Sequence, residues 1–472
     1  MNKPTLKSLI GKRVHFIGIG GAGMSGLARI SLSHGITVSG SDAKDSSVVI
    51  ALSALGAKVS TTHNAGNVDG SDLVVYSNAI SQSNPERTRA QELNIPILTR
   101  AAALAVLMSE SKSVAVAGTH GKTTTSSMLM TVLRAAQLHP SFIIGGEVRG
   151  IGSGATWDSG DHLVVEADES DGTHEQLPLG AVIVTNIDID HLDHFSTFDN
   201  MVESFERFIN AVAGPRVVCA DDASLSAIAL KHNVTTYAIH SPAQFTARNV
   251  QFHDGGSTFD VLHHEVSGDN GLLLGRVALQ LRGEHNVANA LGVIAMSKLL
   301  GVEFGVISSA LVAFSGVSRR FDQRGNDNGV SFVDDYAHLP TEISAVLSSC
   351  RDETDSWKRV IAVFQPNRFN RMQHMSDTYA DCFAAADHVV ITDIYSSGTT
   401  PIAGVTGKLV VDAIARAHPN TSLAWKPTRA ELIQHLATEL RSGDLCISMG
   451  CGDIETLPDE VITARRALRG GS

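Results

Sequence analysis

Short apolar runs alternate with amphipathic stretches along most of the chain, a pattern typical of strands that are followed by helices. Residues 13–20 (RVHFIGIG) predict a buried strand, and the segment SGLARISLSHG predicts a helix that ends at Gly35. Further strands are predicted at 36–42 (ITVSGSD), at 72–80 (DLVVYSNAI) and near residue 97 (IPILTR). Because strands that alternate with helices pair in parallel, we expect an α/β domain that ends near Met108.

The alternation of predicted strands and helices begins again at two later points in the chain. Residues 113–137 predict a strand, a glycine turn and a helix. Strands at 162–170 and 181–191 end in polar clusters, and another strand is predicted near residue 218. The segments FTARNVQFHDGGSTFDVLHH and LLLGRVALQLRG predict antiparallel strands before a helix that starts near His285. Four apolar runs near residues 330, 360, 390 and 446 predict a further doubly wound unit. The fold class is therefore α/β with three domains, at 1–108, 109–316 and 317–472.

Composition and charge restrict the class of protein. The chain has 472 residues, with 37 Lys and Arg against 49 Asp and Glu, a formal charge of −12 that disfavours nucleic-acid partners. Its five cysteines form no CxxC pair, which favours a reducing compartment. No apolar run reaches the ~18 residues of a membrane span, and the N-terminus resembles no secretory signal. We therefore expect a cytoplasmic protein without a membrane partner.

The first glycine loop lies in HFIGIGGAGMSGLA, residues 15–28, between the first predicted strand and helix. The spacing Gly18, Gly20, Gly23 is typical of a dinucleotide-binding fold, and Asp42 lies at the distance expected for a ribose-binding acid. By itself, the loop is as compatible with NAD as with another diphosphate ligand.

The second glycine loop, GTHGKTTT at residues 118–125, carries more information. It follows an apolar strand and opens a helix, so its backbone N–H groups are expected to bind phosphate oxygens. Lys122 is expected to reach the terminal phosphates, and the Thr123 hydroxyl to ligate Mg²⁺. The standard P-loop has a glycine where this chain has Val116, but the shorter form GTxGKT is intact.

Acidic residues follow two neighbouring strands of the central unit. Glu166, Asp168, Glu169 and Asp171 end one strand, and the other ends in a cluster that includes Asp188, Asp190, His191, Asp193 and His194. Acids at the carboxyl end of a parallel strand face the ligand crevice. We expect Glu166 and His191 to hold a second divalent ion, whereas Asp171, Asp188 and His194 are expected in a solvated loop.

Six ordered motifs carry a resemblance that covers nearly the whole chain. They are GTHGKTTT, EADESDG, TNIDIDHLDH, GEHNVANALG, RRFDQRG and DDYAHLPTEI. The chain resembles the Mur ligase family, the ATP-dependent enzymes that build the peptidoglycan stem peptide. The resemblance implies a UDP-binding Rossmann-like domain, a central P-loop ATPase domain and a C-terminal Rossmann-like domain.

The resemblance also implies a reaction. ATP activates a carboxylate as an acyl phosphate, which an amine attacks to give an amide, ADP and phosphate. The first glycine loop and the form ADESD point to the member that joins L-alanine to UDP-N-acetylmuramic acid. The implied cofactors are ATP and two Mg²⁺ ions, with Mn²⁺ as an alternative, and the chain is expected to be a monomer or a homodimer.

The roles implied for individual residues divide into sites. The catalytic residues are Lys122, Glu166, His191 and Arg320, and the metal ligands are Thr123, Glu166 and His191. ATP is expected at Gly118, Thr119, His120, Gly121, Lys122, Thr123, Thr124, Asn286, Asn289, Arg320 and Asp335. The diphosphate of the UDP-sugar is expected at Gly18, Ile19, Gly20, Gly21, Ala22, Gly23, Met24, Ser77 and Asn78, which leaves Asp42 to contact the loop or solvent. Arg320 and Asp335 are expected to reach ATP when the third domain swings in.

The amino-acid pocket is expected at Tyr336, His338 and Arg371, where the arginine grips a carboxylate. The chain departs from the family pattern at Leu339, Asn367 and Thr399 in this region. We expect Arg319 to be a surface charge, and Cys446 and Cys451 to be buried apolar residues.

Several alternatives remain open. A ligase that recycles a whole tripeptide shares both glycine loops, but its EADEYD form differs from EADESD at Ser170. A folate polyglutamate ligase would lack the first glycine loop. An NAD-dependent oxidoreductase would have no use for the second glycine loop. A regulator that only binds a UDP-sugar would tolerate loss of the metal ligands.

Overall fold

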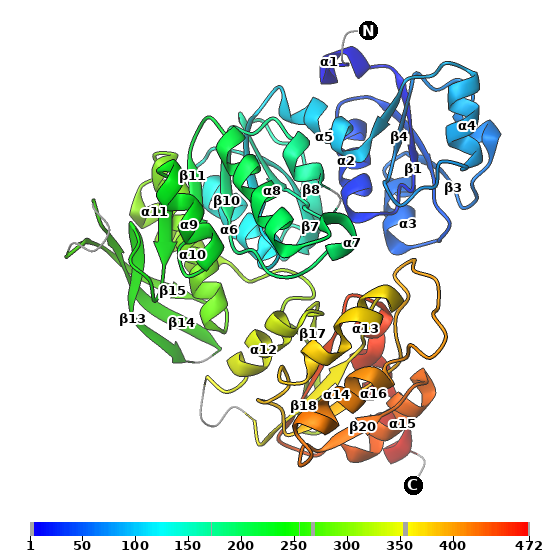
Figure 1. Cartoon of the computed structure of the whole chain (residues 1–472). Helices are drawn as coiled ribbons and strands as arrows, with labels where there is room; N and C mark the ends of the chain where they lie inside the picture. The colour runs from blue at the N-terminus through cyan, green and yellow to red at the C-terminus, as the bar shows by residue number, and fades with distance from the viewer. Residues whose placement is uncertain (1–3, 171, 254, 266–269, 353–356, 471–472) are drawn as a thin grey trace. The chain divides into compact units, whose positions relative to one another are not determined.

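Three β-sheets, each flanked by helices, organise the chain (Figure 1). The computed structural model describes residues 4–170, 172–253, 255–265, 270–352 and 357–470. The chain forms two compact units. One comprises Met1–Val250, Phe259–Leu279 and Val287–Ser315, and the other comprises Gln251–Thr258, Gln280–Asn286 and Gly316–Ser472. The prediction of an α/β fold with three sheet domains is confirmed. Within the described ranges, no helix is long and apolar enough to cross a membrane.

The first sheet is entirely parallel and has five strands. In sheet order these are β3 (Lys58–Ser60), β2 (Thr37–Ser41), β1 (Arg13–Ile17), β4 (Leu73–Tyr76) and β5 (Ile97–Thr99). The helices are α1 (Leu6–Leu9), α2 (Ala22–Ser33), α3 (Ser47–Ala54), α4 (Pro85–Glu92) and α5 (Arg100–Met108), with the 3-10 turn η1 (Ala65–Val68). The strand order reverses between β1 and β4, and a ligand crevice is expected at the carboxyl ends of these two strands.

The central sheet has ten strands. In sheet order these are β15 (Leu272–Leu279), β14 (Gly256–His263), β13 (Phe245–His253), β12 (Thr235–Ala238), β11 (Arg216–Cys219), β10 (Ala181–Val184), β6 (Lys112–Ala117), β9 (His162–Glu166), β7 (Ser141–Val148) and β8 (Ser153–Thr156). The helices are α6 (Lys122–Ala135), α7 (Leu192–Phe195), α8 (Phe198–Ala211), α9 (Ala223–His232), α10 (Glu284–Leu299) and α11 (Phe304–Ala313), with the turn η2 (Thr173–Gln176).

The strand β6 carries the second glycine loop at its carboxyl end. It pairs in parallel with β10 on one side and with β9 on the other. Its middle is fully buried, so its apolar side chains hold the glycine loop after Ala117 in a fixed place. The helix α2 of the first sheet packs on the β7–β8 hairpin, where a Cβ on Gly26 would lie 3.0 Å from Ile143 and 3.3 Å from Ala155. A close helix–sheet contact therefore joins the first two sheets.

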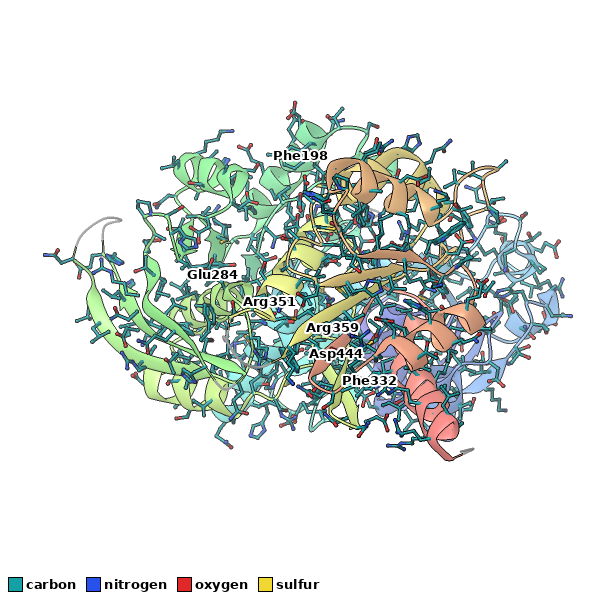
Figure 2. All side chains as sticks on the ribbon, turned by 90° about the horizontal axis from the view of Figure 1, so that it is seen from below. Phe198, Glu284, Phe332, Arg351, Arg359 and Asp444 are labelled. Atoms are coloured by element: carbon teal, nitrogen blue, oxygen red, sulfur yellow. The ribbon has the colours of Figure 1, made fainter. Side chains whose placement is uncertain are left out.

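The third sheet has six strands. In sheet order these are β16 (Asp322–Asp327), β17 (Val330–Asp335), β21 (Asp444–Met449), β18 (Arg359–Phe364), β19 (His388–Ile391) and β20 (Leu423–Trp425). The helices and 3-10 turns are α12 (Pro340–Ser349), α13 (Phe369–Met375), η3 (Ser376–Tyr379), α14 (Lys408–Ala417), α15 (Arg429–Glu439), η4 (Asp453–Thr456) and α16 (Leu457–Gly470). All pairings are parallel except that of β16 with β17. Arg359 and Asp444 are register partners and form a two-bonded ion pair at 2.9 and 2.7 Å (Figure 2).

Among the described residues, six strands are not predicted by the hydrophobic pattern: β3, β7, β8, β12, β16 and β20. β7 carries two glycines and β16 is polar (DQRGND), so neither has the alternation of a half-buried strand. β3 and β20 have only three residues each. Pairing with neighbours, rather than local propensity, makes these segments extended. The strand predicted at 72–80 is shorter than expected, because the chain leaves β4 after Tyr76.

Candidate functional site

The second glycine loop joins β6 to α6 and requires two left-handed glycines. Gly118 has φ +123° and Gly121 has φ +81°, conformations that side chains with a Cβ rarely adopt. A Cβ on Gly118 would also lie 2.2 Å from the Thr185 hydroxyl oxygen. Gly121 is the N-cap of α6, so the loop presents the positive end of this helix.

The carboxyl end of β10 holds the loop in shape. The Asn186 carbonyl accepts the N–H of Thr119 at 3.1 Å, and its side-chain oxygen accepts the N–H of His120 at 2.8 Å. The Thr185 hydroxyl donates to the His120 carbonyl at 2.5 Å. Asp188, predicted in a solvated loop, instead pairs through its carboxylate with His120 Nε2 at 2.9 Å, and its backbone N–H donates to the Thr119 hydroxyl oxygen at 2.9 Å. That prediction is wrong for Asp188, because β10 places it directly against the loop. His194, predicted in the same loop, is exposed as expected but lies in the short helix α7, whereas Asp171 lies outside the described residues.

Lys122, the first residue of α6, pairs with the buried carboxylate of Glu169, for which the sequence predicts no specific role. Its Nζ donates to the two Glu169 oxygens at 2.8 and 2.9 Å and to the Gly118 carbonyl at 2.6 Å. The Glu169 side chain is 1% exposed. Burial opposes the charge of Lys122, but Glu169, Asp168 and Glu166 outweigh it and raise the pKa of the ammonium group.

Asp168 lies beside this pair and binds an arginine from the first sheet. Its Oδ2 accepts a bond from Arg100 Nη2 at 3.1 Å, and its Oδ1 accepts the Ser170 N–H. Burial works against the charge of Asp168, yet Arg100 and Lys122 lower the pKa of the carboxyl to about 2. The acids after β9 therefore meet two cations from different elements.

The proposed metal ligands lie at the ends of three elements. Thr123 and Thr124 are nearly buried in the first turn of α6. Glu166 ends β9, where its Oε1 accepts the Gly145 N–H at 2.9 Å. His191 has φ +52°, and its Nε2 lies 3.1 Å from an Asp190 oxygen. Among the described residues, no group of three or more His, Cys, Asp or Glu side chains is gathered closely enough to hold a metal ion.

The two asparagines of α10 differ in their surroundings. Asn289 is buried and lies against the second glycine loop, because a Cβ on Gly121 would come within 2.6 Å of its Oδ1. Asn286 donates from its amide to the Arg282 carbonyl at 2.7 Å, which is a local bond at the start of the helix. The structure therefore places Asn289 against the second glycine loop, whereas the Asn286 amide bonds the backbone just before its own helix.

The first glycine loop is bonded mostly within its own domain. The Ser41 carbonyl accepts the N–H groups of Gly18 and Ile19, and Asp42 Oδ2 accepts the N–H of Gly20 at 2.9 Å. The prediction that Asp42 contacts the loop is confirmed. The donors that a helix cannot satisfy internally belong to its first turn, which here begins at Ala22, after the N-cap Gly21.

Other predicted residues of this loop lie where the strand order places them. A Cβ on Gly18 would be 3.3 Å from the Cβ of Ser77, so the ends of β1 and β4 meet. Asn78 follows Ser77 in the same turn. Met24 is 1% exposed and packs into the core. Gly23 lies under the Arg100 side chain, whose Nη1 is 3.0 Å from the position of a Cβ on this glycine.

In the second compact unit, Arg319 and Arg320 differ sharply. Arg319 bonds Asp334 at 3.1 Å, the carbonyls of Gly450 and Gly452, and Glu455 at 3.1 Å. Its prediction as a surface charge is wrong, since the side chain is 19% exposed and ties the start of β16 to the end of β21. The Arg320 guanidinium lies 5.0 Å from the centre of the Tyr336 ring.

Asp335, at the end of β17, supports the segment around Arg320. Its carboxylate accepts the N–H of Phe321 at 2.6 Å and that of Ala337 at 2.8 Å. Arg319 and Phe321, on either side of Arg320, both have positive φ, so the carboxylate holds a strained backbone in place. Burial raises the pKa of Asp335 to about 6, although Arg320 and the two N–H bonds act against it.

The residues expected to bind the amino acid follow β17 and β18. The rings of Tyr336 and His338 are 5.5 Å apart and nearly perpendicular. Arg371, on α13, is buried, and its Nη1 donates to Asn367 Oδ1 at 2.8 Å. The Thr399 hydroxyl accepts the N–H of Phe369, the first residue of α13, at 3.0 Å. Two of the three departures from the family pattern thus hold the helix that carries Arg371.

The third residue that departs from the family pattern is Leu339. Leu339 is 2% exposed and packs in the core of the third sheet domain. Cys446 is buried in β21 as predicted, whereas Cys451 is only partly buried, with its Sγ 3.9 Å from the Ser397 hydroxyl oxygen.

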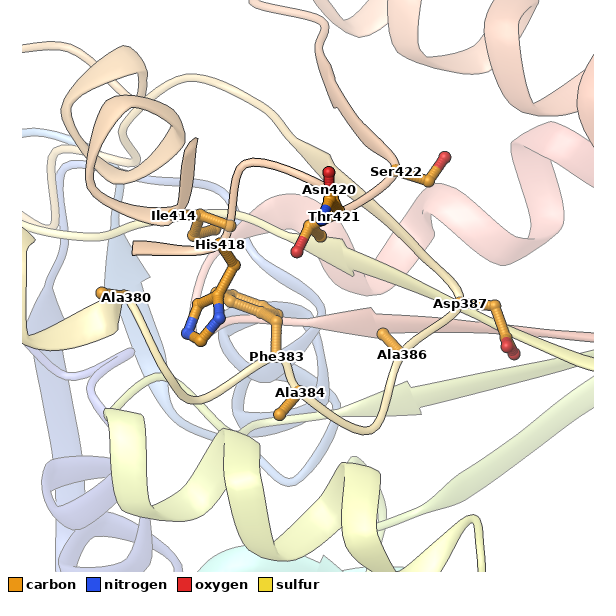
Figure 3. Close-up of a pocket in the computed structure, with 10 residues that line it drawn as sticks. All are labelled: Ala380, Phe383, Ala384, Ala386, Asp387, Ile414, His418, Asn420, Thr421 and Ser422. Carbon is orange, nitrogen blue, oxygen red and sulfur yellow. The ribbon is translucent and has the colours of Figure 1, made fainter. Parts of the chain in front are cut away.

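A cavity of about 280 Å³ lies elsewhere in the same unit (Figure 3). Its walls come from the turn after η3, the end of α14 and the segment before β20, and include Phe383, Ile414 and His418. None of the predicted site residues lines this cavity.

Comparison with known proteins covers nearly the whole chain. Residues 13–112 match the model of the Mur ligase family catalytic domain, residues 116–297 the Mur ligase middle domain, and residues 319–452 the Mur ligase glutamate ligase domain. The chain is 41% identical to the UDP-N-acetylmuramate–L-alanine ligase of Nitrobacter winogradskyi over 93% of its length and 95% of the relative. It is 42% identical to the enzyme of the same name from a Caulobacter species over 93% of the chain and 94% of the relative.

A solved structure agrees with these relatives. The structure of a UDP-N-acetylmuramate–alanine ligase from Thermotoga maritima matches with a TM-score of 0.81 and 27% identity, covering 97% of this chain and all of that one. The two sequence relatives are about 40% identical to this chain over more than nine-tenths of both lengths. The family models match residues in all three sheet domains. The chain belongs to the Mur ligase family.

Proposed function

We propose that the protein is an ATP-dependent ligase that joins L-alanine to the carboxylate of UDP-N-acetylmuramic acid. The product is an amide, and ADP and phosphate are released after an acyl phosphate intermediate. What supports this proposal most is the full-length similarity to ligases of that name, together with a Lys122 that lies among three carboxylates at the end of β9.

The proposed ATP site is the second glycine loop. Lys122 neutralises the charge that develops on the phosphate oxygens, an electrostatic role. The N–H groups at the start of α6 bind the phosphates, and Asn289 supports the adenine side from its position against Gly121. Asn286 is assigned to the adenine, and Arg320 and Asp335 to the phosphates and ribose, by the family resemblance. In-line attack then requires little beyond positioning.

The residues proposed for Mg²⁺ fit the ion's chemistry. Mg²⁺ is held by one or two carboxylates together with substrate phosphates and water, so a cage of three protein acids is not required. Thr123 and Glu166 supply oxygen ligands for one ion. Glu166 and His191 serve a second, and the pairing of His191 with Asp190 suits a metal-binding imidazole, whose other nitrogen is oriented by a carboxylate. When bound at these residues, such ions would reduce the repulsion between the triphosphate and the attacking carboxylate.

The two organic substrates are assigned to the other two sheets. The first turn of α2, with Ser77 and Asn78 nearby, is proposed for the diphosphate of the UDP-sugar. Tyr336, His338 and Arg371 are proposed for L-alanine, whose carboxylate the guanidinium can grip with two bonds. We place the reaction in the cytoplasm, in keeping with five unpaired cysteines, and expect a monomer or a homodimer.

The test is phosphate release by purified protein with ATP, Mg²⁺ and UDP-N-acetylmuramic acid across a panel of amino acids and peptides. L-Alanine should stimulate release most strongly. If L-alanine gives no more than the blank without amino acid, the proposal is wrong. A response to the tripeptide alone would instead identify a recycling ligase.

A binding measurement separates the two nucleotide sites. Lys122→Ala should abolish turnover and leave binding of the UDP-sugar largely intact. NAD should protect the fold against heat less than the UDP-sugar does. The opposite order would return the first glycine loop to a dinucleotide-binding role.

A further inference from the structure

We infer that Arg100 is the cation that holds the diphosphate of the sugar nucleotide at the first turn of α2, and that Asp168 holds Arg100 in place. The inference rests on the proposed function, since it takes the first glycine loop to bind a UDP-sugar. Arg100 lies outside both glycine loops and belongs to a different helix.

The charge balance at the first loop calls for a cation. Residues 15–28 contain no lysine or arginine, in contrast to the second loop with Lys122. A carboxylate is already present, because Asp42 accepts the N–H of Gly20 at 2.9 Å. A diphosphate would add about two negative charges next to this carboxylate. The helix dipole alone offers roughly half a positive charge, so an additional cation is needed nearby.

Arg100 occupies the position for this cation. It follows β5, whose carboxyl end lies at the same edge of the sheet as the ends of β1 and β4. Its Nη1 lies 3.0 Å, and its Cδ 3.1 Å, from where a Cβ of Gly23 would be. The guanidinium therefore covers the first turn of α2. A cation next to the positive end of a helix is unfavourable unless an anion is also present.

Asp168 supplies such an anion from the central sheet. The Arg100–Asp168 pair joins residues 68 positions apart, with Nη2 3.1 Å from Oδ2. The Arg100 side chain is 18% exposed, so solvent screens this pair only in part. A guanidinium has five N–H donors in a fixed fork. Nη2 points to Asp168 while Nη1 lies at Gly23, so one side chain can serve the acid and the diphosphate together.

The test compares binding of UDP and of uridine to the full-length protein by calorimetry or NMR titration. Arg100→Gln should raise the Kd for UDP at least about tenfold, as expected for a lost charged hydrogen bond, and leave the Kd for uridine unchanged. The Kd of Arg100→Lys for UDP should lie between those of the wild type and Arg100→Gln, because lysine keeps the charge but lacks the fork of N–H donors. The difference should shrink at high salt.

Arg89→Gln is the matched control, since Arg89 lies in the same domain and pairs with Asp69 and Glu92 at the surface. It should bind UDP as the wild type does. Equal affinity of Arg100→Gln and wild type for UDP would overturn the inference. So would an equal loss for uridine, which would indicate general damage to the domain. Thermal melting and ATP-analogue binding at the second loop check that the variant is folded.

The role of Asp168 as a positioning residue is tested by a double-variant cycle. Asp168→Asn should weaken UDP binding by less than Arg100→Gln does, and should add no further loss when Arg100 is already glutamine. Additive losses would overturn the anchoring role. If wild-type protein fails to bind UDP-N-acetylmuramic acid, the proposed function itself falls. If the wild type binds it and Arg100→Gln binds it equally well, only this inference fails.

Discussion

The ammonium group of Lys122 lies 2.8 Å from Oε1 of Glu169, a carboxylate that is 1% exposed and 47 residues away in the sequence. Lys122 follows strand β6, and Glu169 follows strand β9, which pairs with β6 in parallel. Lys122 is thus held by a carboxylate where the proposed reaction requires it to meet phosphate oxygens. A phosphate must compete with Glu169, or share the lysine with it.

Removing one member of this pair should be costly for stability. We expect Lys122→Ala to lower the free energy of unfolding by on the order of 3 kcal/mol, because a buried carboxylate loses its cation. Adding Glu169→Gln should restore most of that loss without restoring turnover. Urea unfolding of both variants measures the first effect, and phosphate release the second. Full stability of Lys122→Ala alone would contradict this prediction.

Substitutions of the adjacent residues Arg319 and Arg320 should have different effects, the first on stability and the second on activity. Arg319→Ala removes bonds to Asp334, Glu455 and two backbone carbonyls, and we expect it to lower the melting temperature of the protein clearly. Arg320→Ala should leave the melting temperature nearly unchanged and reduce kcat, because this residue is proposed to act on the phosphates. The two variants are matched in size and charge. If they have the same effect on melting, the distinction drawn between them is wrong.

Stability should depend on pH through a buried carboxylate of the first domain. Glu86 is fully buried and accepts bonds from Ser41, Asn67 and His63. Burial opposes its charge, but His15 and the hydrogen bonds from Ser41 and Asn67 lower its pKa from 4.5 to about 2. A lowered pKa stabilises the fold above pH 4.5, and this stability is lost as the pH falls toward 2.

The shift corresponds to about 3 kcal/mol. We expect Glu86→Gln to lose much of this stability at pH 7 and to flatten the dependence between pH 5 and 2. Urea unfolding followed by circular dichroism at several pH values measures both effects. A variant whose pH dependence equals that of the wild type would contradict the prediction.

The proposed amino-acid pocket should depend on Asn367. Since Asn367 accepts a bond from Arg371 at 2.8 Å, Asn367→Ala should let the guanidinium move. We expect the KM for L-alanine to rise about tenfold, with little change in the KM for ATP. Asn420→Ala, at an exposed position of the cavity in Figure 3, is the matched control. A parallel rise in both KM values would show that the change is not confined to the amino-acid site.

The fold class and the positions of both glycine loops follow from the order of residue types alone. Strands such as β1 and β6 are continuous apolar runs, and Gly118 and Gly121 must be glycines because of their backbone conformations. These are local constraints, so they appear directly in the order of residue types. The contact of Asp42 with the first loop was also predictable, because it follows the neighbouring strand.

Which charged side chains meet depends on how the chain folds in three dimensions. The sequence does not distinguish Glu169 from the other acids after β9 or Arg319 from a surface charge, and it predicts no partner for Arg100. Each has a partner many positions away: Lys122, Asp334 and Asp168. Such pairs depend on strand order, which brings the ends of β6, β9 and β10 to one edge of a sheet, and on the packing of α2 against the β7–β8 hairpin. Residue spacing carries no direct record of either, because side chains from distant segments meet only after the strands have paired and the helices have packed.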